Sequence, residues 1–183
     1  MMTKLLIISD SHRDDEKLID VLNKYKNHTI IHAGDSCLEV TDSILKDVYC
    51  VIGNHDFEPF PEYIVLKPYF ICHGHTFKVY HTFDQMIELA KKNQCHTIIH
   101  GHTHIPYDKV HDGIRIINPG SLMINRGSYG FGTYVILNPE NQEIHFYHHT
   151  THEIVDDIVI EDGLKTFKEF KDLIAEFNLW KRS

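Results

Sequence analysis

The stretch Gly53-Asn54-His55-Asp56 follows the apolar run Val48-Tyr49-Cys50-Val51-Ile52, so three polar side chains come where a strand is expected to end. An amide oxygen, an imidazole and a carboxylate in adjacent positions can supply a metal ligand, a general acid and the group that orients that acid. Gly, Asn and Asp also form ordinary surface turns. Because one short motif has a high false-positive rate, the functional interpretation depends on the motifs around it.

The composition is that of an ordinary soluble globular protein. The chain has 183 residues, of which 42% are hydrophobic and 24% are charged, and this length fits one domain. Lys and Arg number 18 against 26 Asp and Glu, which gives a formal charge of −8. That balance argues against a protein that binds nucleic acid by neutralising phosphates. It leaves a small anionic substrate open, since bound cations dominate the field of such sites.

Cysteine spacing and the N-terminal residues bear on the cellular compartment. The four cysteines form no C-x-x-C pair, so we expect neither a structural zinc site nor disulfides. The apolar run Leu5 to Ile8 is too short for a signal-peptide core or a membrane span. We therefore expect a cytoplasmic protein that does not bind membranes. The unusual feature of the composition is its 16 histidines.

Short apolar runs alternate with helical patterns in the first part of the chain. Asp14 can cap a helix whose apolar residues recur every 3.6 positions up to Tyr25. A weak helix is expected at about 38–45, and Thr82 with Gln85 resembles a capping box before another helix. The opening β-α-β-α-β order predicts a largely parallel sheet. Strands of this part are expected at 5–8, 29–31, 48–52, 63–66, 69–72 and 97–99.

Hairpins are expected from Tyr107 onwards, because Asp112-Gly113 is a typical turn between two β-type runs. The tail from Asp162 has an amphipathic helical pattern with several aromatic residues. No internal repeat or linker composition divides the chain. We therefore expect one domain over residues 1–183, with 162–183 as a C-terminal helical extension.

Polar motifs follow five of the expected strands. In an open α/β sheet, ligands bind at the carboxyl ends of the strands, so these motifs are expected to converge. Carboxylate, imidazole and amide groups without a thiolate suit a divalent metal of borderline or hard character, and there are enough of them for two ions. The residues that follow the five strands are Asp10, His12, Asp35, Asn54, His55, His73, His102 and His104.

A pair of metal ions suits phosphoryl transfer, because it can activate a bridging water and bind the oxygens of an in-line displacement. A carboxylate between the two ions would offset their mutual repulsion. Asp35 is the lone carboxylate of its loop and is the natural bridging group.

Five motifs in this order resemble the calcineurin-like metallophosphoesterases. They are Asp10-Ser11-His12, Gly34-Asp35, Gly53-Asn54-His55-Asp56, His73-Gly74-His75 and Gly101-His102-Thr103-His104. The small size and the segment Ile117-Asn118-Pro119-Gly120-Ser121 make the chain most similar to the compact bacterial and archaeal phosphodiesterase branch. The resemblance runs from about Leu5 to Leu137 and does not cover the tail after about Thr150.

The resemblance implies a four-layered α/β/β/α sandwich with two mixed β-sheets and two bound divalent metal ions. His55 matches the position proposed to protonate the leaving oxygen, with Asp56 behind it. Several members of the compact branch carry Cys where His55 stands, so this chain departs toward the wider phosphatase pattern. On the family pattern, one ion would bind Asp10, His12, Asp35 and His104, and the other Asp35, Asn54, His73 and His102.

The implied reaction is hydrolysis of a small phosphodiester by attack of a metal-bridging hydroxide on phosphorus. Manganese is the metal that family members often prefer, and Zn²⁺, Fe²⁺, Ni²⁺ or Co²⁺ also suit these ligands. A phosphomonoesterase or nucleotide phosphatase on the same site is the alternative within enzymes. A catalytically weak protein-binding scaffold of the same fold is the alternative from another class.

Several residues are left outside the predicted site. For His75 and His100, packing or hydrogen bonding behind the ligands is favoured over direct metal binding, and a solvated surface position is favoured for Arg13. The histidines of 145–152 are expected on a surface strand, and metal storage is disfavoured because the other histidines occur in ordered motifs. The aromatic face of the C-terminal helix can pack on the domain or form a homo-oligomer.

Overall fold

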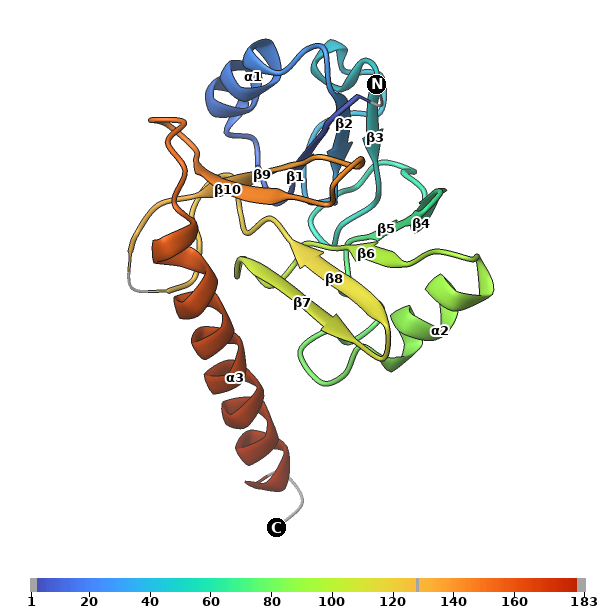
Figure 1. Ribbon diagram of the computed structural model, residues 1–183, viewed down its shortest axis with the longest axis vertical. Coiled ribbons are helices and arrows are strands. Elements are labelled where there is room, and N and C mark those ends of the chain that lie inside the picture. Colours follow the sequence, from blue (N-terminus) through green and yellow to red (C-terminus); the bar gives the residue numbers. More distant parts are fainter. Residues whose placement is uncertain (1–2, 128, 181–183) are drawn as a thin grey trace.

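The computed structural model describes residues 3–127 and 129–180, which fold into two five-stranded sheets flanked by three helices (Figure 1). Residues 1–2, 128 and 181–183 of the expected domain lie outside this part. The helices are α1 (Asp15–Lys24), α2 (Asp84–Lys92) and α3 (Asp156–Trp180). The strands are β1 (Leu5–Ile8), β2 (Thr29–His32), β3 (Val48–Cys50), β4 (Tyr63–Leu66), β5 (Tyr69–Cys72), β6 (Thr97–Ile99), β7 (Tyr107–His111), β8 (Ile114–Asn118), β9 (Thr133–Leu137) and β10 (Ile144–His148).

Both sheets are mixed. In the first, with the order β10-β9-β1-β2-β3, the strands β1, β2 and β3 are parallel, and β9 and β10 are antiparallel to their neighbours. In the second, with the order β4-β5-β6-β8-β7, the three central strands are parallel and the two edge strands antiparallel. The parallel sheet predicted from the β-α-β-α-β pattern is therefore confirmed.

Side chains of alternate residues in each strand serve two different cores, as the period-2 geometry of a strand requires. Leu5 and Ile7 of β1 pack between the two sheets, whereas Leu6 and Ile8 pack toward α1. In the second sheet, Ile99 faces the first sheet and Ile98 packs toward α2 and α3. Since both faces of each sheet are covered, these strands are continuously apolar. The layers run α/β/β/α, as predicted.

The predicted cap of α1 is confirmed, whereas two other helix predictions are wrong. Asp14 caps α1, with its side chain accepting a hydrogen bond from Lys17 N. The predicted capping box of α2 is wrong, because Phe83 occupies the N-cap position and makes no capping bond with its side chain. The weak helix expected over 38–45 is also wrong, since only Ser43–Leu45 forms a single 3₁₀ turn there.

Helix α3 begins six residues before the predicted position and docks on the second sheet of its own chain (Figure 1). Phe167 is buried and stacks on Phe83, with ring centroids 5.6 Å apart and planes 9° apart. Gly163 lies against the loop after β6, where an added Cβ would fall 2.1 Å from Pro106 O. Within the described residues, no helix has the length and apolar composition needed to cross a membrane.

Candidate metal centre

The loops after β1, β2, β3, β5 and β6 meet at one end of the two sheets. Backbone hydrogen bonds join them: Asp10 N donates to Gly34 O (3.0 Å), and Gly101 N donates to His73 O (3.1 Å). Side chains spread over about half of the sequence therefore reach one place, as the strand-end argument predicted. The loop backbones are unusual, because five candidate ligands have positive φ: Asp10, His12, Asp35, His102 and His104. Strained backbone of this kind concentrates at functional sites.

Three of the candidate ligands place their polar atoms around a common point. His104 Nε2 lies 3.0 Å from Asp10 Oδ1 and 3.3 Å from His12 Nε2. The remaining pair, His12 Nε2 and Asp10 Oδ1, is 4.0 Å apart. Mutual distances of this size allow one carboxylate oxygen and two imidazole nitrogens to share a single cation.

A second group lies beside the first and shares Asp10 with it. His73 Nε2 is 3.3 Å from Asp35 Oδ2, 3.2 Å from Asn54 Oδ1 and 3.9 Å from Asp10 Oδ1. Asp35 Oδ2 is also 3.9 Å from His12 Nε2, so this carboxylate oxygen faces both groups. Its other oxygen, Oδ1, accepts a hydrogen bond from His55 N at 2.7 Å.

His102 is placed less directly than the other candidate ligands. Its ring lies 5.2 Å from the ring of His73, and its backbone N–H donates to Asp10 Oδ2 at 3.1 Å. Among the described residues, its ring nitrogens belong to neither of the two groups. The structure thus places a polar atom of each of six predicted ligands within 4.0 Å of at least one other, with His102 at the edge.

The hydrogen bonds of Asp10 and His73 leave donor atoms free for a cation. Asp10 is fully buried, and its Oδ2 accepts from Ser9 Oγ at 2.6 Å. Among the described residues, no donor is well aligned with Oδ1, although His104 Nε2 lies 3.0 Å from it. A buried carboxylate oxygen in that state is costly unless a cation faces it. His73 Nδ1 donates to Ala33 O at 2.7 Å, which directs the lone pair of Nε2 toward Asp35. These residues therefore fit a divalent metal.

Protonation states favour metal binding as well. Burial alone would raise the pKa of Asp10, but His73 and His104 hold it well below its usual range. Burial lowers the pKa of His12, and burial together with the nearby His73 lowers the pKa of His102 to about 4. The carboxylate is then ionised and both imidazoles are neutral near pH 7, which are the forms that coordinate metals.

His73 behaves differently, because it lies between two carboxylates. Burial lowers the pKa of its imidazole, but the charges of Asp10 and Asp35 outweigh this effect and raise it. A proton on His73 thus offsets the negative charge that a bound cation would otherwise neutralise. Metal binding at this position is expected to displace that proton.

Asp56 has a different role from the one predicted. Its Oδ2 accepts from Asp35 N (2.8 Å) and Gly53 N (2.7 Å), and its Oδ1 accepts from Cys37 N at 2.6 Å. None of its hydrogen bonds within the described part of the chain goes to the ring of His55. The prediction that Asp56 orients His55 is therefore wrong, because the carboxylate turns inward to satisfy buried backbone donors. Asp56 instead links the loop of Asp35 to the loop of Gly53.

Gly53 has no room for a side chain, since an added Cβ would fall 2.0 Å from Asp35 Oδ1. The segment 117–121 supports the loops from the other side. Asn118 Nδ2 donates to Gly101 O at 2.8 Å, and Ser121 Oγ donates to Asp10 O at 2.9 Å. Asn118 and Ser121 thus hold the backbone of the loops that carry Asp10 and His102.

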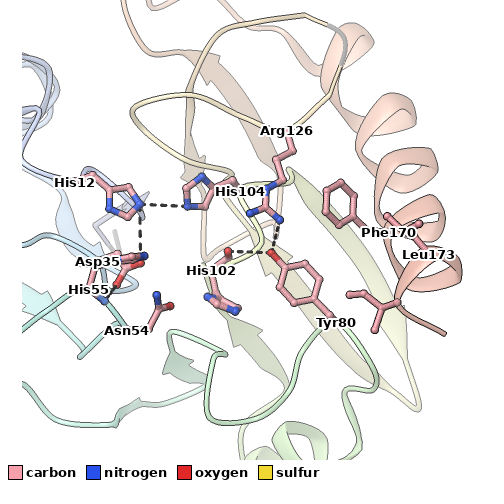
Figure 2. A pocket seen from close by; sticks show the side chains of 11 residues that line it. His12, Asp35, Asn54, His55, Tyr80, His102, His104, Arg126, Phe170 and Leu173 are labelled. Carbon is pink, nitrogen blue, oxygen red and sulfur yellow. Dashed lines mark hydrogen bonds and ion pairs between the residues drawn. The ribbon is translucent and has the colours of Figure 1, made fainter. Parts of the chain in front are cut away.

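A cavity of about 320 Å³ opens over the two groups. Figure 2 shows candidate ligands and His55 on one side of it, and Tyr80, Arg126 and Phe170 on the other. His55 is exposed there, with its ring 5.3 Å from that of His12.

Sequence reasoning missed the opposite wall of this cavity. The amphipathic pattern of the tail was a usable signal, but it did not specify which surface the helix would cover. The missed lining residues are Tyr80, Arg126, Phe170, Leu173 and Ile174.

Comparison with known proteins gives consistent matches. Residues 3–142 match the family model described as the calcineurin-like phosphoesterase superfamily domain. A Bacillus subtilis protein named "probable metallophosphoesterase YsnB" is 32% identical over 161 residues, which cover 83% of this chain and 95% of that protein. A "probable metallophosphoesterase" of Mycoplasma pneumoniae is also 32% identical, over 75% of this chain and 90% of its own.

Solved structures share the fold. A Streptococcus pneumoniae protein described as a predicted phosphoesterase has a TM-score of 0.78 at 26% identity, covering 84% of this chain and 92% of its own. An archaeal phosphodiesterase (TM-score 0.60; 79% of this chain, 99% of its own) and Entamoeba histolytica Vps29 complexed with Zn²⁺ (TM-score 0.63; 83% and 96%) are each 23% identical. At that identity the last two show a shared fold alone.

We expect Asp56→Asn to destabilise the protein by about 1–3 kcal/mol, because an amide cannot accept from all the buried N–H groups that face Asp56. Urea denaturation measures this change, and metal content after dialysis is expected to fall as the Asp35 loop loosens. The exposed Asp172→Asn is the matched control. Equal unfolding free energies for the two variants would contradict the assigned role.

Proposed function

The chain belongs to the calcineurin-like phosphoesterase superfamily, and from this premise we propose that it hydrolyses phosphodiester bonds with two bound divalent metal ions. The observation that carries the proposal is a single carboxylate oxygen, Asp35 Oδ2, facing His12 Nε2 at 3.9 Å and His73 Nε2 at 3.3 Å. A carboxylate so placed can be shared between two cations.

The proposed ligand sets follow the family pattern. Distances of 4.0 Å or less between potential ligand atoms support six of the seven assignments. The six residues are Asp10, His12, Asp35, Asn54, His73 and His104. His102 is assigned on the family pattern alone. One ion would bind Asp10, His12, Asp35 and His104, and the second would bind Asp35, Asn54, His73 and His102.

When bound, two such ions supply an activated water nucleophile and positive charge opposite the phosphoryl oxygens. The surrounding residues would donate the proton and hold the ligands in position. His55 is exposed to the cavity beside His12, so its imidazole can donate a proton to the leaving oxygen. The Asp35 side chain stays in place because His55 N–H engages Oδ1, while Asp56 holds the Asp35 backbone.

Manganese is the proposed metal, and the mixed oxygen and nitrogen ligands also suit Zn²⁺, Fe²⁺, Ni²⁺ or Co²⁺. The related fold of Entamoeba histolytica Vps29, in complex with Zn²⁺, supports a divalent ion in this architecture. It also motivates the competing proposal of a protein-binding scaffold. The archaeal phosphodiesterase of the same fold supports the choice of a diester over a monoester.

The decisive experiment assays the protein, reconstituted with Mn²⁺, in parallel on bis(p-nitrophenyl) phosphate and p-nitrophenyl phosphate. We expect hydrolysis of both with a larger kcat/KM for the diester, and no turnover after chelation of the metal. A larger kcat/KM for the monoester would favour the phosphatase alternative. Absence of turnover at full metal content would favour the scaffold.

Asp35→Asn is expected to abolish turnover and to weaken binding of both ions, because the shared carboxylate loses its charge. Metal content by mass spectrometry and hydrolysis of the diester measure the two effects. Asp172→Asn, with an exposed carboxylate on α3, is the control for a lost negative charge. Retained activity of Asp35→Asn at stoichiometric metal would contradict the bridging role.

His55→Ala is expected to lower kcat about 100-fold or more while leaving metal content unchanged, because it removes a proton donor and no ligand. The exposed His96→Ala serves as the matched control, since that side chain lies outside the cavity. A His55→Ala enzyme as active as the wild type would remove this residue from the mechanism.

A further inference from the structure

The wall of the cavity opposite the candidate ligands consists of aromatic, apolar and cationic side chains. Tyr80 and Arg126 come from two loops, and the remaining three residues come from α3. Helix α3 lies beyond residues 3–142, which match the family model. The α3 part of this wall therefore lies outside the part of the chain that matches the family model, whereas Tyr80 and Arg126 lie within it. The α3 residues in the wall are Phe170, Leu173 and Ile174.

Close packing sets the position of α3 relative to the cavity. Gly163 allows the helix to approach Pro106 O, two residues after His104, where a larger residue would clash. One turn later, Phe167 is buried against the second sheet and stacks on Phe83. Phe170 and Leu173, which follow on the same helix, are thereby directed toward the candidate metal site.

Tyr80, Arg126 and Phe170 form one connected surface (Figure 2). Arg126 Nη1 donates to Tyr80 Oη at 2.6 Å, and its guanidinium lies 4.9 Å from the centroid of the Phe170 ring. The rings of Tyr80 and Phe170 are stacked, with centroids 6.2 Å apart. Arg126 N also donates to His104 O at 2.8 Å, which ties this surface to the ligand loop.

The surface is continuous with the candidate ligands. The ring of Tyr80 lies 5.3 Å from that of His102, and its hydroxyl donates to His102 O at 3.3 Å. A phosphoryl group held near the metal ligands would therefore direct one of its ester substituents along this wall. The cavity of about 320 Å³ is at the small end of the range for ligand pockets, so this substituent is a single compact group.

We propose that this wall is a subsite for an aromatic or heteroaromatic ester group, so that aryl phosphodiesters are the substrate class. The inference rests on the proposed function of the same site. Leu173 is 59% exposed, and burying such an apolar side chain under a planar ring is favourable. The Tyr80 hydroxyl donates to His102 O and accepts from Arg126 Nη1, so its only hydrogen is already engaged and it cannot also donate to a polyol.

Binding of two phosphonates to the Mn²⁺-loaded protein tests the subsite without any turnover. Calorimetric titration is expected to show phenylphosphonate binding about tenfold more tightly than methylphosphonate, as stacking on an aromatic surface would produce. Phe170→Ala and Leu173→Ala are each expected to reduce this ratio toward one. Ile158→Ala is the matched control, since Ile158 is exposed on α3 and does not line the cavity. Leu173 is exposed, so its replacement does not open the core.

The inference is overturned if wild-type protein binds both phosphonates equally, or if both wall variants keep the wild-type ratio. Hydrolysis of bis(p-nitrophenyl) phosphate and methyl p-nitrophenyl phosphate, which share a leaving group, separates the two proposals. Turnover of both diesters without any phenyl preference would refute the subsite and support the proposed function. Tighter binding of phenylphosphonate that the wall variants lose, together with no hydrolysis of either diester, would support the subsite and refute the proposed function.

Discussion

Burial of two carboxylates side by side is the constraint on which the rest of this structure depends. Asp10 and Asp35 are almost completely shielded from water, yet no donor in the described part of the chain is well aligned with Oδ1 of Asp10. Two neighbouring negative charges in a poorly hydrated place repel each other strongly unless positive charge lies between them. The imidazole of His73 supplies part of that charge by retaining its proton more firmly, and a metal ion would supply more.

Keeping these carboxylates in place requires a second set of polar residues that do not touch the metal position. Asp56 collects backbone N–H groups from two loops, and Asn118 and Ser121 bind the loops after β6 and β1. Five of the candidate ligands also have positive φ, a conformation that costs of order 1–3 kcal/mol each and persists only when its surroundings enforce it. The loops are therefore preorganised by hydrogen bonds between residues that are far apart in the sequence.

The cavity has two sides with different origins. The candidate ligands and the proposed proton donor come from strand ends within the part that matches the family model, and in the proposed reaction they would face the phosphoryl group. The opposite side includes three residues of α3, which lies beyond that part. If both proposals hold, such a division would let the reaction stay constant while a peripheral helix sets which ester group is accepted. The helix is held by Gly163 and Phe167, so its contribution is built into the packing of the domain.

Local pattern in the sequence was enough to predict the strands, the parallel order of β1 to β3 and the residues at their ends, because strand period and strand-end chemistry are encoded in neighbouring residues. The capping of α2, the inward turn of Asp56 and the peripheral position of His102 were not predictable in this way. Each depends on distant groups: the side chain of Asp56, for example, turns toward N–H groups on loops about twenty residues away. Only the tertiary structure decided that α3 would complete the cavity, because an apolar helical stripe specifies burial and leaves its partner surface open.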